Sequence, residues 1–230
     1  MDEIVAPSAP RRIKFRFGLS VVSAIGKRND RKHPNVLRLS IIRGPFQRML
    51  MNLLLRLPTF LQVPIAAVFP GFFLPDRVVL KKAKEGWLEE FENEKSMYER
   101  LENLQGRVIP RLYGEAICEG ARALILSEII GIMPWEQKLP PLPVDEFKAL
   151  VDTAWRELNA LGLAYDDVGL DNLIIVGDRV MVVDLESVYE PAHEYKAYIF
   201  KSDRIQLGEV YQRYLDNYED DSDGAFWEQF

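Results

Sequence analysis

Hydrophobic and polar positions along this chain fall into two kinds of pattern. Short apolar runs bounded by Gly, Pro or charged residues are typical of strands, and longer segments with apolar residues every three or four positions are typical of helices. The pattern predicts strands at residues 77–82, 112–118 and 121–127 and allows a further strand within residues 12–22. It predicts helices at residues 46–57, 85–104, 145–161 and 201–217. Strands and one helix precede the later helices and a hairpin, so we expect an α+β protein with two lobes.

The predicted helix at residues 46–57 has an unusually wide apolar face. Pro45 suits its first turn, and Arg48, Asn52 and Arg56 form a narrow polar stripe at a spacing of four residues. A face of this width implies burial against the body of the protein or contact with a membrane surface. Burial is the expected outcome, and membrane contact through residues 36–57 is the less favoured alternative.

The segment that follows is apolar but broken by proline. Nineteen uncharged residues lie between Arg56 and Asp76, which approaches the length of a membrane span. Four prolines interrupt them, and proline disrupts both the hydrogen bonds and the packing of a helix. We therefore expect buried strands and turns here and no membrane span.

One helix carries a carboxylate within its apolar stripe. The helical spacing places four residues on one face: Phe91, Glu94, Tyr98 and Leu101. A carboxylate that faces a core costs several kcal/mol, very roughly, unless a cation meets it. Lys81, at the end of the preceding apolar strand, is the nearest candidate for that cation. The alternative is that Glu94 lies at the edge of the stripe and reaches water.

Composition limits the compartment and the kinds of metal site. The chain has 230 residues, is 48% hydrophobic and 28% charged, and is typical of a globular protein in these respects. Its one cysteine, Cys118, permits no internal disulfide, which fits a reducing compartment and predicts a cytoplasmic or nuclear protein. Two distant histidines, His33 and His193, give no support for a zinc site.

Charge is distributed unevenly. Residues 11–56 carry twelve Lys/Arg and one acid, whereas residues 57–230 carry seventeen Lys/Arg and thirty-two Asp/Glu. A basic segment ahead of an acidic body could bind the chain's own acidic surface, anionic lipid or nucleic acid, or be a solvated arm. There is no clear nucleic-acid motif.

The most specific candidate chemistry lies between residues 165 and 184. Two apolar runs, 173–176 and 180–183, flank Gly177-Asp178, which predicts a hairpin with a two-residue turn. In that register Asn172 and Asp184 lie at the same open end of the hairpin. An amide oxygen beside a carboxylate suits Mg²⁺ together with phosphate oxygens. Asp167, in the loop before the hairpin, is free to address a substrate hydroxyl.

These segments together resemble the protein kinase superfamily, and in particular compact, atypical members such as short kinase-like proteins of fungi. The resemblance rests on Val78-Val79-Leu80-Lys81, Asn93-Glu94-Lys95, the hinge-like run from Leu124 to Gly131, Tyr165-Asp166-Asp167 with Asn172, and Asp184-Leu185-Glu186. It implies ATP and Mg²⁺ as cofactors. It also implies that Lys81 contacts the phosphates, Glu94 orients Lys81, Asp167 serves the acceptor hydroxyl, and Asn172 and Asp184 hold magnesium. The adenine contacts would fall at Glu128 and Ile130.

The resemblance also implies a fold and a set of domains. It predicts a two-lobed kinase-like fold, with a small antiparallel-sheet amino-terminal lobe and a reduced, mostly helical carboxy-terminal lobe. The corresponding boundaries are a basic, partly disordered or helical extension at 1–56, the two lobes at 57–131 and 132–218, and an acidic tail at 219–230.

Three functions follow as alternatives. The first is an ATP- and Mg²⁺-dependent phosphotransferase that acts on a hydroxyl acceptor, with a protein as the expected acceptor. The second is a pseudokinase, which binds nucleotide or serves as a scaffold. It is favoured by the lack of a Gly-rich loop before Lys81 and by Glu186, which stands where kinases have glycine. The third is a small-molecule kinase of the aminoglycoside or choline kinase type.

Overall fold

The computed structural model describes residues 10–28, 33–138 and 140–220. The chain forms two compact units, each with its own core. Unit 1 comprises residues 1–88 and 111–128, and unit 2 comprises residues 89–110 and 129–230.

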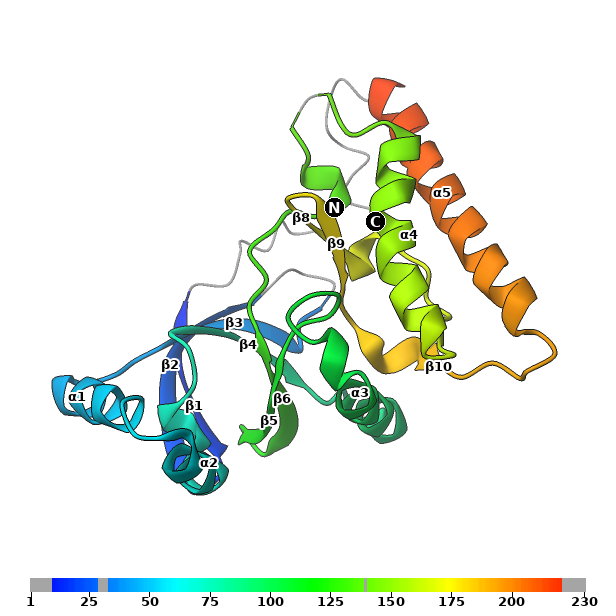
Figure 1. Cartoon of the computed structure of the whole chain (residues 1–230). Coiled ribbons are helices and arrows are strands. Elements are labelled where there is room, and N and C mark those ends of the chain that lie inside the picture. The colour runs from blue at the N-terminus through cyan, green and yellow to red at the C-terminus, as the bar shows by residue number, and fades with distance from the viewer. Residues whose placement is uncertain (1–9, 29–32, 139, 221–230) are drawn as a thin grey trace. The chain divides into compact units, whose positions relative to one another are not determined.

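Unit 1 is built around a closed antiparallel barrel of six strands, blue to green in Figure 1. The strands are β1 (Arg11–Phe17), β2 (Ser20–Arg28), β3 (Val36–Ile41), β4 (Arg77–Lys82), β5 (Leu112–Cys118) and β6 (Ala121–Ser127). Their order around the barrel is β1-β2-β3-β4-β6-β5, and β1 closes it by pairing with β5. The predicted strands at β4, β5 and β6 are confirmed.

Strict alternation along β1 explains which of its side chains fill the barrel. In β1, Ile13, Phe15 and Phe17 are each 2% exposed and enter the barrel core, whereas the residues between them are basic and exposed. The predicted β5–β6 hairpin is confirmed, with Cys118 opposite Ala121. Its turn residues, Glu119 and Gly120, have φ angles of 54° and 84°, the left-handed conformation that a two-residue hairpin turn requires.

Two helices follow β3 in unit 1. Helix α1 (Pro45–Leu54) begins at the predicted Gly44-Pro45 start, and helix α2 (Thr59–Val68) is followed by a 3₁₀ turn, η1 (Pro70–Phe72). Neither helix has a buried residue, so the expected burial of the first helix is wrong. The expectation of buried strands at 57–75 is also wrong, because Pro64 is accommodated within α2. Across the described ranges, no helix has the length and apolar character needed to cross a membrane.

Unit 2 combines three helices with two short antiparallel pairs. The helices are α3 (Leu88–Arg100), whose first residue belongs to unit 1, α4 (Val144–Ala160) and α5 (Lys196–Asp220). The paired strands are β7 (Ala164–Tyr165) with β10 (Val188–Tyr189), and β8 (Leu173–Val176) with β9 (Arg179–Val182). Short 3₁₀ turns are η2 (Glu102–Leu104), η3 (Pro134–Glu136), η4 (Leu170–Asn172) and η5 (Leu185–Ser187).

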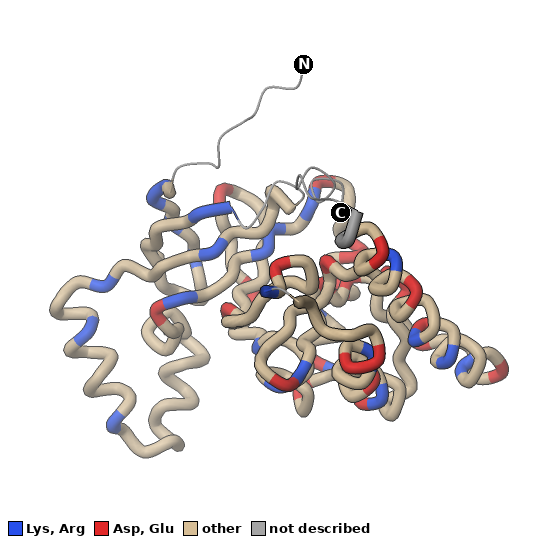
Figure 2. The backbone as a smooth tube through the Cα atoms, turned by 90° about the horizontal axis from the view of Figure 1, so that it is seen from above, with Lys and Arg blue, Asp and Glu red and all other residues tan. Residues whose placement is uncertain are grey.

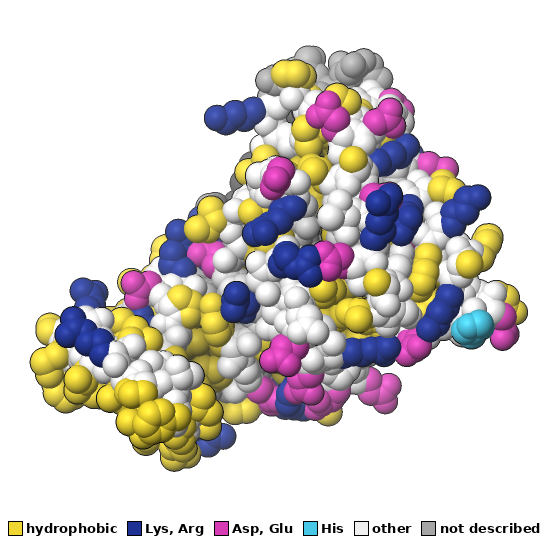
Figure 3. All heavy atoms as spheres, viewed as in Figure 1, with side chains coloured by type: hydrophobic (Ala, Val, Ile, Leu, Met, Phe, Trp, Pro, Cys, Tyr) yellow, Lys and Arg dark blue, Asp and Glu magenta, His cyan; other side chains and the backbone are white. Residues whose placement is uncertain are grey.

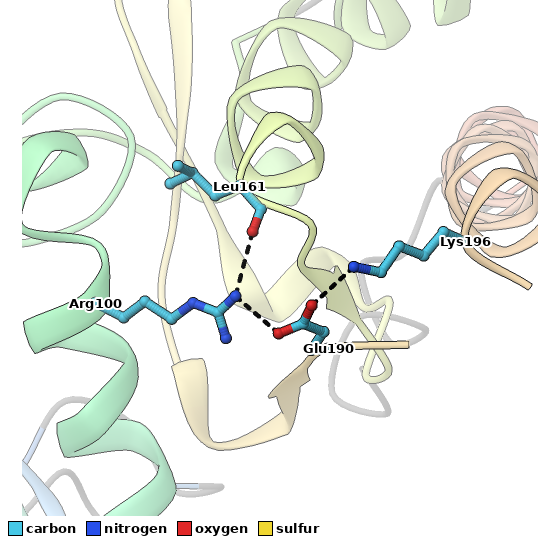
Figure 4. A network of polar contacts seen from close by, with 4 residues as sticks. All are labelled: Arg100, Leu161, Glu190 and Lys196. Carbon is cyan, nitrogen blue, oxygen red and sulfur yellow. Dashed lines mark hydrogen bonds and ion pairs between the residues drawn. The ribbon is translucent and has the colours of Figure 1, made fainter. Parts of the chain in front are cut away.

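Packing and a polar network join the helices of unit 2. Helices α4 and α5 lie side by side (Figure 1), and the rings of Phe147 and Tyr211 stack with centroids 3.8 Å apart. Arg100 of α3 donates to the Leu161 carbonyl at the end of α4 and to Glu190, 3.4 and 2.9 Å away (Figure 4). Lys196, the first residue of α5, donates to the same carboxylate at 2.8 Å. Hydrogen bonds from Lys196 and Arg100 hold the pKa of Glu190 below its usual value.

The predicted kinase-like fold is contradicted by the barrel. Such a fold has an open sheet in its smaller lobe, whereas the six strands of unit 1 close on themselves. The closure comes from residues 11–41, which form three strands where the sequence suggested a partly disordered or helical extension. Their outward Lys and Arg residues obscured the alternating pattern. The predicted acidic tail lies largely outside the described residues, from 221 onward.

Candidate metal centre

The β8–β9 hairpin has the register predicted from the sequence. Leu173 pairs with Val182, and the two-residue turn at Gly177-Asp178 joins the strands. The Val183 amide donates to the Asn172 carbonyl over 2.9 Å, which extends the ladder by one step. Asn172 and the residue after Val183 therefore come to the same end of the hairpin, as expected.

Asp184 leaves the hairpin in an uncommon backbone conformation. Its φ and ψ are 61° and 66°, in the left-handed region that residues other than glycine seldom adopt. The Tyr165 hydroxyl donates to the carbonyls of Val183 and Asp184, at 3.0 and 2.8 Å. The chain turns at Asp184 and enters η5, which contains Glu186. The strained turn thus presents two carboxylates, two residues apart, on either side of buried Leu185.

Helix α3 supplies the third carboxylate. The Asn93 side chain donates to the carbonyls of Glu186 and Val188, at 2.8 and 2.9 Å, and so fastens α3 to the segment after Asp184. The face of α3 that carries Phe91, Glu94 and Tyr98 is buried, as the helical spacing predicted, and Glu94 is 1% exposed. The alternative in which Glu94 reaches water is therefore wrong.

Glu94, Asp184 and Glu186 form an acidic cluster. One carboxylate oxygen from each residue lies within 4.8 Å of the others, a spacing at which a single ion can bind all three. Carboxylate oxygens are the ligands of hard divalent cations such as Mg²⁺ and Ca²⁺. The three carboxylates of the cluster have the chemistry of such a site.

Two buried tyrosines have raised pKa values, to which burial and the negative charge of the acidic cluster both contribute. Burial, and then the nearby carboxylates of Glu94 and Asp184, raise the pKa of Tyr98 well above its usual value. Burial and the surrounding acids, with Asp184 the first among them, raise the pKa of Tyr165 in the same way. Tyr98 is fully buried, and within the described part of the chain its hydroxyl has no hydrogen-bond partner. A hydroxyl of this kind is available to a water molecule on a bound cation.

Asp167 and Asn172 are joined directly. The Asn172 side-chain nitrogen donates to the Asp167 carboxylate at 3.0 Å and to the Asp167 carbonyl at 3.1 Å. Asn172 is 3% exposed, whereas the Asp167 side chain is exposed. In this orientation the Asn172 amide oxygen is the atom directed away from Asp167. Asp167 is thereby held in place but remains accessible, as a group that receives a proton from a substrate must be.

The other predicted site residues lie on different elements. Lys81 is 7% exposed and lies on β4 of unit 1, on the opposite face from the core residues Val78 and Leu80. Glu128, also in unit 1, forms an ion pair with Arg77 at 2.6 Å. Ile130 belongs to unit 2 and is 82% exposed. The predicted roles of Lys81, Glu128 and Ile130 toward a nucleotide stay predictions.

Glu186 is the candidate ligand that the sequence analysis missed. The resemblance to kinases presents Glu186 only as a departure from their glycine and assigns the metal to Asn172 and Asp184. The sequence signal for Glu186 was the order acidic, apolar, acidic at residues 184–186. These residues come just after the second strand of the predicted hairpin.

Comparisons with known proteins add no family to this geometry. No protein-family model matches the chain, and none of the curated proteins matches its sequence.

Proposed function

We propose that the chain is a divalent-cation-dependent phosphotransferase that moves the γ-phosphate of ATP to a hydroxyl acceptor. The observation that carries the proposal is the acidic cluster, with three carboxylate oxygens within 4.8 Å of one another. Phosphoryl transfer depends mainly on positioning and on the neutralisation of charge by metal ions. ATP as the phosphate donor comes from the sequence resemblance and not from the cluster.

Each residue has a distinct role in the proposal. Asp184, Glu186 and Glu94 hold Mg²⁺, which neutralises charge on the phosphates. Asn172 contributes its amide oxygen as a further ligand, a role that comes from the resemblance to kinases. Asp167, fixed by its 3.0 Å bond from Asn172, accepts the proton of the acceptor hydroxyl. A protein is the expected acceptor, and a cytoplasmic or nuclear location fits the single cysteine.

A second candidate function is nucleotide binding without turnover. Kinases have a Gly-rich phosphate loop ahead of the residue that corresponds to Lys81. In that region of this chain, residues 70–72 form the 3₁₀ turn η1 instead. Backbone amides closed into such a turn are poorly placed to surround phosphates. This feature favours a binding or scaffold module over an active transferase.

Thermal-shift titration with ATP and Mg²⁺ tests nucleotide and metal binding. We expect the unfolding temperature of the wild-type chain to rise with both ligands together, and the rise to disappear in Asp184→Asn. Asparagine tolerates the left-handed backbone of residue 184, so the variant removes charge without new strain. Asp178→Asn, the same change at the turn end of the hairpin, serves as the matched control. A wild-type chain with no Mg²⁺-dependent shift would contradict the proposal.

Transfer of labelled γ-phosphate distinguishes the two candidate functions. The acceptor panel contains hydroxyl-bearing peptides, aminoglycosides and choline. Asp167→Asn is expected to lower transfer by at least about a hundredfold while metal binding persists. Asp166→Asn, an exposed neighbour in the same loop, is the control. Binding without transfer to any acceptor would favour the scaffold function, and Lys81→Ala tests whether that lysine contributes to nucleotide binding.

A further inference from the structure

The α1–α2 hairpin of unit 1 is an exposed apolar surface. Nine large apolar side chains of the hairpin and its end are between 41% and 73% exposed: Phe46, Met49, Leu53, Leu55, Phe60, Leu61, Val63, Val68 and Phe69. Figure 3 shows the hairpin as a knob dominated by hydrophobic side chains. Soluble proteins seldom expose so much contiguous apolar surface unless it contacts a partner or a membrane.

The apolar surface continues onto the barrel. The amide of Leu19, in the β1–β2 turn, donates to the Val68 carbonyl at the end of α2 over 3.1 Å. Leu19 and Val21 are 75% and 67% exposed. The hairpin and this turn therefore form one apolar surface, which we call the apolar hairpin surface.

The charged residues within the hairpin are basic, and basic residues outnumber acidic ones in the rest of unit 1. No Asp or Glu occurs between residues 31 and 75, and Arg48 and Arg56 are the charged residues of the hairpin. A cavity of about 230 Å³ opens beside the start of α1, with Arg12 in its lining together with Arg43, which is paired with Asp76. Unit 1 has 18 Lys/Arg and 8 Asp/Glu, whereas unit 2 has 11 and 27. Figure 2 shows this difference along the backbone. Unit 1 is thus complementary to an anionic surface.

At the tip of the hairpin, a side chain satisfies the hydrogen bonding of two backbone carbonyls. The Gln62 side chain donates to the carbonyls of Leu55 and Leu57, at 3.2 and 2.6 Å, at the end of α1 and in the turn. These carbonyls would otherwise need water. Backbone groups in lipid must be satisfied within the protein, so this arrangement is suited to an apolar medium.

We propose that the α1–α2 hairpin inserts into the surface of a membrane that contains anionic phospholipid. Each helix has ten residues and is therefore about 15 Å long, half of a hydrocarbon core of about 30 Å. The hairpin can enter one leaflet only. Helix α2 is apolar apart from Thr59 and Gln62, whereas the exposed apolar side chains of α1, Phe46, Met49 and Leu53, share one face. The spread of apolar side chains on α2 suits lipid, which contacts a helix from several sides, better than a groove, which contacts one face.

Flotation of the full chain with lipid vesicles tests this proposal. The vesicles contain phosphatidylcholine alone or phosphatidylcholine with phosphatidylserine. The wild-type chain is expected to float with the anionic vesicles. Phe60→Ser with Val63→Ser should weaken binding at least about tenfold, because both side chains lose their apolar area. Tyr198→Ser with Ile205→Ser on α5 is the matched control, since those residues are 74% and 51% exposed.

A second variant separates lipid charge from apolar insertion and does not depend on the first. Arg48→Gln with Arg56→Gln should weaken binding to anionic vesicles by about fivefold for each arginine and reduce its salt dependence. Light scattering measures the oligomeric state of the same samples. No flotation with anionic vesicles, or equal flotation of the Phe60/Val63 variant, would overturn the proposal. A dimer that the Phe60→Ser/Val63→Ser change converts to monomer, without flotation, would assign the surface to a second copy of the chain.

Discussion

Buried polar side chains carry most of the functional information at the scale of single residues. Glu94, Tyr98 and Asn172 are all within 3% of complete burial. Glu94 belongs to the acidic cluster, and burial and the charge of the cluster raise the pKa of Tyr98. Asn172 donates to Asp167. Burial of such groups costs free energy unless a partner compensates it. Packing alone therefore does not explain why polar side chains occupy these buried positions.

Removal of the Tyr98 hydroxyl should have opposite effects on stability and on metal binding. In the presence of a chelator, Tyr98→Phe should leave the free energy of unfolding unchanged or raise it by about 1 kcal/mol, because an unsatisfied buried hydroxyl is removed. Affinity for Mg²⁺ should fall, because the hydroxyl no longer binds a water of the ion. Urea denaturation with and without Mg²⁺ measures both effects. A large loss of stability with chelator present would show that the hydroxyl has a structural partner.

Asp203 should make stability depend on pH. It lies on α5 and is 8% exposed, and burial raises the pKa of its carboxyl from 3.8 to about 6 despite a hydrogen bond from the Tyr165 backbone. The folded chain therefore holds this proton more tightly than the unfolded chain. The favourable contribution of the protonated Asp203 carboxyl to the free energy of unfolding is complete below about pH 4. It is lost as pH rises through about 6.

Replacement of Asp203 by asparagine should remove this dependence. At pH 8, Asp203→Asn is expected to be more stable than wild type by up to about 2 kcal/mol, and the difference should disappear near pH 4. Asp216→Asn, at an exposed position on the same helix, provides the comparison. Thermal unfolding between pH 4 and 8 gives both curves. A variant less stable than wild type at pH 8 would refute the assignment.

At the scale of elements, local pattern predicted the strands and helices of the middle of the chain well. The β5–β6 and β8–β9 hairpins have the expected turns and registers, because turn residues and alternation agree there. A strand was allowed within residues 12–22, where β1 lies, but the second and third barrel strands and α2 were not predicted. Basic residues on the outer face of β1 resembled a charged arm, and four prolines in the segment around α2 suggested turns.

Gly131 provides a test of packing between elements of unit 2. A Cβ at this position would lie 2.5 Å from the Ile174 side chain and 2.5 Å from the Ile175 carbonyl. The next residue, Ile132, exchanges backbone hydrogen bonds with Ile175, so the segment has little freedom to move. Gly131→Ala should therefore destabilise the chain by about 1–3 kcal/mol. Gly44→Ala, where a Cβ has no neighbour within 4 Å, should change stability by about 0.5 kcal/mol or less. Chemical denaturation measures both, and equal effects would contradict the packing.

At the scale of the whole molecule, the resemblance to kinases was wrong about the architecture, and the site residues it implies stay predictions. The order of polar positions led to Glu94, Asp167, Asn172 and Asp184, which the structure gathers within unit 2. The closed barrel could not be expected, because closure depends on pairing between β1 and β5, about one hundred residues apart in sequence. Such long-range pairing leaves no local signal.

The distribution of the acidic cluster predicts where a cation should stabilise the molecule. All three carboxylates belong to unit 2, so Mg²⁺ should slow amide hydrogen exchange in α3 and in residues 183–188. Exchange in the barrel strands should change little. Mass spectrometry of peptides from both units measures this, and equal protection of barrel peptides would indicate a different binding site.

Direct titration with Mn²⁺, followed by electron paramagnetic resonance, tests the central claim that the acidic cluster binds a divalent cation. The wild-type chain should bind one Mn²⁺ that Mg²⁺ displaces. Asp184→Asn should weaken that binding at least about tenfold, and Asp178→Asn should leave it unchanged. No bound Mn²⁺ in the wild-type chain, or equal affinity in wild type and Asp184→Asn, would contradict the account.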